Sequence, residues 1–272
     1  MVNASTEDWE EYLYIPLWRT IRLEDVQLFV RMLDAGANFV GNGILHDAVR
    51  GGLEEFCQLL LARGADVDEH DKYGANDTPL MAAVPFAFGV SMAELLLAAG
   101  ANVDERNFND MSALDLAVYE GNVSFVQLIA GRVRDINEYD REGKTVLHYT
   151  TSVEIVNELV SAGSDVNGGR DGTPLHYASE GGQVDVMVAL LGFGASPNIT
   201  DERGDTALHV LCYTRAAGFR HAVHKLLEFG ADISSLNKNG DTPAQLLNGS
   251  TIDMTASSDE VGRVRLLLRA GM

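Results

Sequence analysis

The sequence predicts an all-α solenoid of about eight helix–turn–helix units joined by short finger turns. The main observation is one well-formed unit, from Asp171 to Asn198, which reads D-G-T-P-L-H-Y-A-S-E-G-G-Q-V-D-V-M-V-A-L-L-G-F-G-A-S-P-N. Pieces of this unit recur along the chain with a period of roughly 33 residues. A fixed period indicates stacked units that each contact only their neighbours, rather than one globular core.

The first half of the unit predicts a short helix that ends in a turn. Thr173 is suited to cap the helix by accepting a hydrogen bond from a free backbone N–H. Pro174 follows at the first helical position, where its missing N–H costs nothing. Leu175 and Ala178 supply an apolar face, and Gly181-Gly182 ends the helix and turns the chain back.

The second half predicts a second amphipathic helix. Val184, Met187, Leu190 and Leu191 recur at spacings of three and four residues. Gly194 ends this helix at a position suited to positive φ. One such pair cannot bury its own apolar face, so each pair needs a neighbour.

The other copies follow in order, with a degenerate copy first and an irregular copy last. Their recognisable pieces are Pro16-Leu17 with Gly36-Ala37-Asn38, Leu45-His46 with Gly64-Ala65-Asp66, Thr78-Pro79-Leu80 with Gly100-Ala101-Asn102, Ala113-Leu114 with Asp135-Ile136-Asn137, Leu147-His148 with Gly163-Ser164-Asp165, Ala207-Leu208-His209 with Gly230-Ala231-Asp232, and Thr242-Pro243 with Ala270-Gly271.

Four copies depart from the regular pattern. The short spacing from Thr145 to Thr173 predicts truncated helices and a short finger there. Pro85 is expected to end its helix early. Insertions are expected to map to loops, and they are Ala75-Asn76-Asp77, Arg215-Ala216-Ala217-Gly218 and the polar stretch from Gly249 to Asp259.

On these motifs the chain resembles the ankyrin-repeat family over nearly its whole length. The resemblance implies a single ankyrin-repeat domain over residues 1–272, with the degenerate first copy at about 9–40 and the irregular last copy at about 237–272. It also implies a binding scaffold for other proteins. An alternative expectation is that the chain is cut from a larger protein, because no polar capping helix follows Ala270-Gly271-Met272.

Composition restricts the class and the compartment. No apolar run approaches the ~20 residues of a membrane helix, and the acidic N-terminus lacks the layout of a signal peptide. Cys57 and Cys212 lie in different copies and are expected to be separate reduced thiols. These features predict a cytoplasmic or nuclear protein.

The formal net charge of −20 bears on partners. It disfavours nucleic acid and anionic membranes as ligands, since both require lysine and arginine to neutralise phosphates. It favours another protein, with a basic one steered by the field. The alternative is that the charge serves only solubility.

Several motifs resemble sites but have scaffold explanations. His46, His148, His176 and His209 share the fourth position of T-P-L-H, where the resemblance implies contacts to neighbouring fingers. His221 and His224 lack further metal ligands, and the Asp-rich turns lack calcium-loop spacing. The glycine stretch 167–172 lacks the G-K-[ST] ending of a phosphate loop. We expect no metal and no cofactor. No catalytic motif is present, so a non-enzymatic role is favoured.

Candidate partner-binding residues follow from the concave groove that the resemblance implies, at the finger tips and the turns between helices. They are Tyr73, Phe86, Phe108, Met111, Tyr119, Arg141, Glu180, Arg203 and Tyr213. The aromatic residues around Thr78 and Ser112 predict a binding hot spot. The alternative is that Phe86 and Phe88 fold back to fill the space left by Pro85.

The sequence therefore predicts an adaptor or regulatory subunit that binds a segment of another protein in its groove. The alternative is a small-molecule-binding or catalytic protein whose site is assembled inside the groove, with Glu180 and Arg203 among its charged residues. An enclosed pocket with convergent polar groups would favour this alternative.

Overall fold

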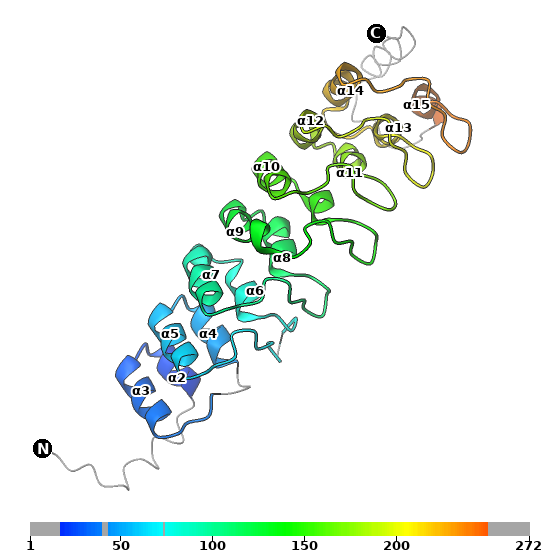
Figure 1. Ribbon diagram of the computed structural model, residues 1–272. Coiled ribbons are helices and arrows are strands. Elements are labelled where there is room, and N and C mark those ends of the chain that lie inside the picture. The colour runs from blue at the N-terminus through cyan, green and yellow to red at the C-terminus, as the bar shows by residue number, and fades with distance from the viewer. Residues whose placement is uncertain (1–16, 40–42, 73, 250–272) are drawn as a thin grey trace, which may run out of the picture. The chain divides into compact units, whose positions relative to one another are not determined.

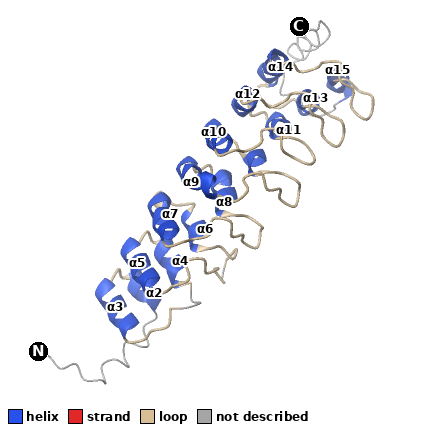
Figure 2. Cartoon of the chain, viewed as in Figure 1, coloured by secondary structure: helices blue, strands red, loops and turns tan. Residues whose placement is uncertain are grey.

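A computed structural model of the chain describes residues 17–39, 43–72 and 74–249. These residues are all-helical, with no strand and one isolated bridge between Thr200 and Thr206 (Figures 1 and 2). The predicted fold class is confirmed. The chain divides into two compact units, Met1–Arg132 and Val133–Met272, which are described separately. The prediction of a single domain over residues 1–272 stays a prediction.

The first unit contains four consecutive helix pairs among its described residues. The pairs are α2 (Leu17–Arg22) with α3 (Val26–Asp34), α4 (Ile44–Arg50) with α5 (Glu54–Ala62), α6 (Pro79–Ala83) with α7 (Gly89–Ala98), and α8 (Ala113–Tyr119) with α9 (Val123–Ile129), which continues into the 3₁₀ turn η1 (Ala130–Arg132). Figure 1 shows the first helices α4, α6 and α8 beside the finger loops, and the second helices α5, α7 and α9 on the side away from these loops.

The second unit repeats this arrangement. Its described elements are the 3₁₀ turn η2 (Val146–Tyr149) with α10 (Val153–Ser161), α11 (Pro174–Glu180) with α12 (Val184–Gly192), α13 (Ala207–Thr214) with α14 (Phe219–Glu228), and α15 (Pro243–Gly249). The insertion predicted after Gly249 and the remainder of the last copy lie outside the described residues. The total of about eight copies therefore stays a prediction.

The core of each unit consists of the apolar stripes that the repeat predicts. Leu175 of α11 and Leu190 of α12 have no exposed surface, and Ala178 lets the two helices approach closely. In the first unit Phe29 and Phe56 meet edge to face, with ring centroids 4.8 Å apart. Because each stripe packs on the helices of neighbouring pairs, pairs stabilise one another rather than folding alone.

Four buried histidines each connect their own first helix to the finger that follows, as the scaffold interpretation predicts. The Nε2 atom of His176 lies 3.0 Å from the Asp205 carbonyl oxygen, and that of His209 lies 3.1 Å from the Asp241 carbonyl. His148 makes the same contact with Gly172 at 3.2 Å, and His46 makes it with Asp77 at 2.9 Å. These imidazoles are therefore used by the scaffold.

The cap of α11 differs in one detail from its prediction. The Thr173 hydroxyl lies 2.9 Å from His176 Nδ1 instead of accepting from a free backbone N–H. The Thr173 N–H donates to the same ring nitrogen at 3.0 Å. Nδ1 is therefore the acceptor, and Nε2–H is left to donate to the next finger.

Asparagines at the base of the fingers form a second set of links between repeats. In the second unit Asn167 Oδ1 accepts from the Ser196 N–H at 2.8 Å, and Asn198 Oδ1 accepts from the Asp232 N–H at 2.8 Å. The Asn198 side-chain amide also donates to the Gly230 carbonyl at 2.9 Å. The Asp-rich turns thus serve finger geometry, as expected.

The irregular copies behave largely as predicted. The copy at Thr145 has only the 3₁₀ turn η2 as its first helix, but α10 is a full nine residues, so the expected truncation of both helices was wrong. The side chain of Ser152 caps α10 by accepting from the Ile155 N–H, which supports a full second helix. Helix α6 ends at Ala83, shortly before Pro85, as expected.

Both cysteines are free and fully buried. Burial raises the pKa of the Cys57 thiol to about 12, and it also raises the pKa of Cys212. Such thiols are inert structural groups. No helix among the described residues is long and apolar enough to cross a membrane.

Core truncation tests the stacking of the second unit. We expect Leu175→Ala and Leu190→Ala each to lower the free energy of unfolding by roughly 2–4 kcal/mol, because both side chains are fully buried and leave cavities. Chemical denaturation measures this. Leu236→Ala is the control, since Leu236 is 63% exposed and should change stability by less than ~0.5 kcal/mol. Equal effects of the core and control changes would contradict the packing.

The histidine contacts predict a pH dependence. Burial lowers the pKa of His46, His148 and His176 from the ordinary 6.5, so each ring takes up a proton less readily in the folded chain than in the unfolded chain. The unfolded chain takes up protons first as pH falls through 6.5. The free energy of unfolding that these three histidines contribute is therefore fully present above pH 6.5 and is lost as the pH falls below 6.5.

His176→Ala isolates one member of the set. We expect a loss of roughly 1–2 kcal/mol at pH 7.5, from the missing hydrogen bonds. The difference from wild type should shrink as pH falls, because the variant lacks one group that takes up a proton on unfolding. Urea denaturation at pH 7.5, 6.5 and 5.5 measures both. A difference that stays constant with pH would contradict the scaffold role.

Candidate functional site

The residues of the predicted hot spot in the first unit differ in how far their side chains are exposed. Phe108 and Tyr119 are 73% and 74% exposed. Phe108 lies on a finger held by its N–H bond to the Ala75 carbonyl (2.9 Å), and Tyr119 is the last residue of α8. Met111 is half-buried, and Tyr73 lies outside the described residues. In the part of the chain described, no ring contact joins Phe108 to Tyr119.

The position of Phe86 fits the alternative prediction, in which Phe86 and Phe88 fold back to fill the space left by Pro85. Its ring is half-buried and stacks on that of Phe88, with centroids 5.1 Å apart and an interplanar angle of 5°. The Phe88 ring in turn reaches Gly52, where a β-carbon would come within 3.2 Å of it. These contacts fill the space after the early end of α6 and favour a packing role for both rings.

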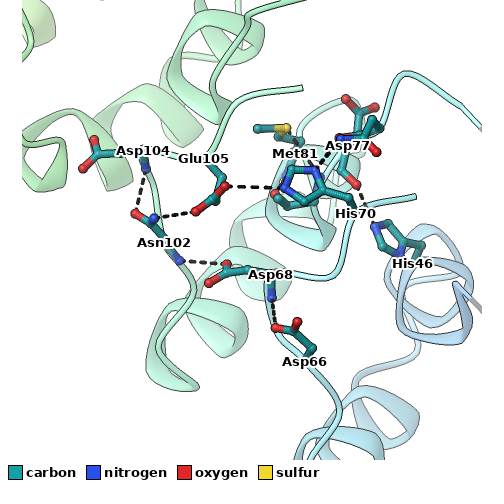
Figure 3. Close-up of polar contacts among 11 residues, drawn as sticks. His46, Asp66, Asp68, His70, Asp77, Met81, Asn102, Asp104 and Glu105 are labelled. Atoms are coloured by element: carbon teal, nitrogen blue, oxygen red, sulfur yellow. Dashed lines mark hydrogen bonds and ion pairs between the residues drawn. The ribbon is translucent and has the colours of Figure 1, made fainter. Parts of the chain in front are cut away.

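Finger-to-finger contacts surround this region (Figure 3). The Asn102 N–H donates to Asp68 Oδ1 at 2.9 Å, and the Asn102 amide donates to Glu105 at 2.8 Å. Glu105 Oε2 lies 3.4 Å from His70 Nε2. Burial, with the Glu105 and Asp66 carboxylates nearby, raises the pKa of Asp68. The acidic turns here use their oxygens within the scaffold.

In the second unit three predicted residues meet at one surface hollow. Glu180, Arg203 and Tyr213 come from α11, a finger and α13, and all three line a cavity of about 280 Å³. Arg141 lies exposed on another finger and does not line it. We call this cavity the α11–α13 hollow. The other residues that line it are Asp171, His176, Tyr177, Asp201, Asp205, Val210, Thr214, Asn237, Asn239 and Leu246.

Local turn chemistry shapes the finger side of the α11–α13 hollow. Asp201 Oδ1 accepts from the N–H groups of Arg203 and Asp205, each at 2.8 Å. Asn237 Oδ1 does the same for Asn239 and Asp241, each at 3.0 Å. An acceptor at the start of each finger therefore fixes the loop that follows.

The charge of the α11–α13 hollow is predominantly negative. Asp171, Glu180, Asp201 and Asp205 supply carboxylates, and Arg203 supplies the one cation of the lining. Arg203 Nε lies 3.4 Å from Asp201 and 3.9 Å from Asp205, but its side chain is 75% exposed. At the rim, the Asp171 carboxylate raises the pKa of Glu202 through a hydrogen bond and like charge. The resident arginine thus leaves an excess of negative charge.

The histidine in the wall of the α11–α13 hollow is committed to the fold. His176 Nδ1 accepts from Thr173, and Nε2 contacts the Asp205 carbonyl. No cluster of three or more histidine, cysteine, aspartate or glutamate side chains suited to a metal ion occurs among the described residues. The arrangement therefore offers recognition by shape and charge, with aromatic rings as its apolar part.

Sequence reasoning missed a neighbouring aromatic and cationic cluster. Lys144 Nζ lies 4.6 Å from the ring centroid of Tyr177, 5.5 Å from that of Tyr149, and 2.7 Å from Glu142 Oε2. The Tyr149 hydroxyl donates to Asp140, and that contact and burial raise the pKa of Tyr149. The signal in the sequence was a tyrosine directly after each of His148 and His176.

Comparison with protein families places these features in context. A family described as ankyrin repeats (three copies) matches residues 22–107, 45–140, 114–201 and 175–271. A putative ankyrin repeat protein of Acanthamoeba polyphaga mimivirus is 23% identical over 229 residues, covering 79% of this chain and 30% of that protein. The E3 ubiquitin-protein ligase hecd-1 of Caenorhabditis elegans is 37% identical over 102 residues, covering 36% of this chain and 3% of the ligase.

Solved structures give the same fold. The ankyrin repeat domain of Bcl-3, a member of the IkappaB protein family, matches with a TM-score of 0.68 and 25% identity, over 83% of this chain and 99% of that domain. The human ASB11 ankyrin repeat domain matches with a TM-score of 0.66 and 23% identity, over 82% and 96%. The chain spans less than a third of the length of the curated relatives named above.

The two roles assigned to Phe86 and Phe108 can be separated by stability. We expect Phe86→Ala to lower the free energy of unfolding by about 1–2 kcal/mol, because it removes a stacked, half-buried ring. Phe108→Ala should change it by less than ~0.5 kcal/mol, since that ring is exposed. Urea denaturation of both variants measures the difference. If Phe86→Ala left the free energy of unfolding unchanged, the packing role would be wrong and Phe86 would again be a candidate for the predicted hot spot.

Proposed function

The chain belongs to the ankyrin-repeat family, and we propose that it is an adaptor or regulatory subunit that binds a segment of another protein. Ankyrin repeats are generally protein–protein interaction modules. The proposed binding face consists of the first helices and the fingers. The proposal treats residues 1–272 as one interaction domain.

The observation that carries this proposal is the exposure of aromatic side chains at finger and helix-end positions. Phe108, Tyr119 and Tyr213 are 73%, 74% and 52% exposed. Tyr119 and Tyr213 occupy the same repeat position, seven residues after the caps Ser112 and Thr206. Exposed aromatics lose little conformational entropy on binding and are typical anchors of interfaces.

The charge supports a basic segment as the partner's contact region. The net charge is −20, and the α11–α13 hollow has four carboxylates against one guanidinium. Complementary charge accelerates association and selects among partners more than it adds affinity. The same charge disfavours phosphate-rich ligands such as nucleic acid and anionic membranes. The buried free thiols fit a reducing compartment, so we propose a cytoplasmic or nuclear location.

A small-molecule site in the groove is the second candidate. The convergence of Glu180, Arg203 and Tyr213 on one hollow is the observation that favours it. The polar groups deepest in that hollow, His176 and Asp201, are engaged in fixing the repeat and its finger. A side chain or short segment of a partner suits this lining better than chemistry at those groups does.

Partner capture with matched variants tests the proposed function. We expect proteins retained by the wild-type chain to be lost, by tenfold or more on the scale of interface anchors (~2 kcal/mol), with Phe108→Ala/Tyr119→Ala or with Tyr213→Ala. Thermal melts would show that these variants are folded. Quantitative mass spectrometry of the retained proteins gives the readout.

Exposed phenylalanines on the second helices provide the control. Phe193 and Phe229 follow the ends of α12 and α14 and are 44% and 43% exposed. Phe193→Ala and Phe229→Ala should retain every partner. If these changes abolished capture while the aromatic changes on the first helices and fingers did not, the binding face would lie on the second helices instead.

A further inference from the structure

In the second unit consecutive repeats differ at the position directly before the cap threonine. The residue before the cap threonine is Lys144 in one repeat, Gly172 in the next and Asp205 in the one after. In the first of these, Lys144 lies between the rings of Tyr149 and Tyr177 and pairs with Glu142. An internal cation therefore occupies the space between two groove tyrosines there.

One repeat later the equivalent position has no side chain. Gly172 has φ +142°, and a β-carbon placed on it would lie 3.7 Å from Tyr177 Cε2. A β-carbon there would also lie 3.6 Å from His176 Cβ, so a side chain at this position would stand between His176 and Tyr177. With glycine there, the α11–α13 hollow lies open beside Tyr177.

The lining of the α11–α13 hollow combines aromatic rings with carboxylates, and both attract a cation. Tyr177 and Tyr213 provide aromatic surface, with Val210 and Leu246 as aliphatic neighbours. Glu180 is exposed and makes no hydrogen bond or ion pair to any residue that the structure describes. In the following repeat, Asp205 places a carboxylate where the first repeat has its lysine.

We propose that the α11–α13 hollow receives a lysine or arginine side chain from a segment of a partner protein. The cation lies against Tyr177 and Tyr213, which both line the hollow, and pairs with the Glu180 and Asp171 carboxylates of the same lining. This inference deepens the proposed function, on which it rests, by specifying the chemistry of the recognised segment.

The like-charged pair at the rim supports the same occupant. Asp171 and Glu202 approach closely enough for the Asp171 carboxylate to raise the pKa of Glu202. The charged groups around this pair are Asp201, Arg203 and Lys238. A further cation between the hollow and this rim would reduce the repulsion between the two carboxylates.

Peptide titration tests the proposal on the full chain. The probes are fluorescein-labelled Ser-Gly-Ser-Gly-X-Gly-Ser-Gly-Ser peptides in which X is arginine, lysine or the uncharged isostere citrulline, followed by fluorescence polarisation. We expect at least one cationic peptide to bind about fivefold or more tightly than the citrulline peptide, since cation–π and ion-pair contacts need the charge. The ratio between arginine and lysine peptides identifies guanidinium or ammonium as the better fit.

Variants locate the binding. We expect Tyr213→Ala and Glu180→Gln each to weaken binding of the cationic peptide by about three- to tenfold. Tyr213→Phe should bind the peptide as wild type does, because phenylalanine keeps the aromatic face. Glu154→Gln is the matched charge control on α10, and Phe229→Ala is the matched aromatic control at the end of α14. Both should bind as wild type does.

Three results would overturn the proposal. They are equal binding of the citrulline peptide, equal loss with Glu154→Gln and Glu180→Gln, and no binding by wild type at millimolar peptide. The proposed function fails separately. If captured partners depend on Phe108 and Tyr119 but not on Tyr213 or Glu180, protein binding stands and the cation hollow does not.

Discussion

The hydrogen bond from a buried imidazole to the next finger is the contact on which the second unit depends. His176 is held at Nδ1 by Thr173, and its Nε2 reaches the Asp205 carbonyl of the following finger. This bond sets the distance between α11 and that finger, and so the width of the α11–α13 hollow. A neutral ring is required, because one nitrogen accepts while the other donates.

In the first unit His46 makes the same contact with the Asp77 carbonyl, but α6 and α8 have no histidine at this position. At the equivalent positions Met81 and Asp115 complete the helix caps, with Ser112 donating to Asp115 at 2.8 Å. Neither contact extends to a following finger as the histidine contacts do. The fingers there are also linked by side chains, since the Asn107 amide donates to Asp77 at 2.8 Å, as the Asn237 amide donates to Asp205 at 2.8 Å in the second unit. The amide link therefore occurs in both units, and in the second unit His176 adds a buried ring to the wall of the α11–α13 hollow.

Much of this was predictable from sequence, because the repeat encodes it locally. Leu175, Leu190 and the T-P-L-H histidines identify the core and the links wherever the period is intact. The cluster of Lys144 with Tyr149 and Tyr177 was not predictable, since it depends on the lateral spacing of repeats. Phe86 appeared exposed by register, but the early end of α6 turned it onto Phe88. Tyr213 and Glu180 both line the α11–α13 hollow, but the hollow itself brings together helices and fingers of successive repeats and could not be read from one repeat.

Net charge alone left both solubility and partner recognition open, and the structure separates the carboxylates that finger geometry uses from those that it does not. Asp140 and Asp201 each accept from two backbone N–H groups, so part of the negative charge is required by finger geometry. Glu180 makes no such contact with the described residues, and Asp171 lies against another carboxylate. Charge needed only for solubility would be better dispersed, because like charges close together destabilise the folded chain. The proposed recognition of a basic segment rests on these carboxylates, which lie beside Tyr177 and Tyr213 in the lining of the hollow.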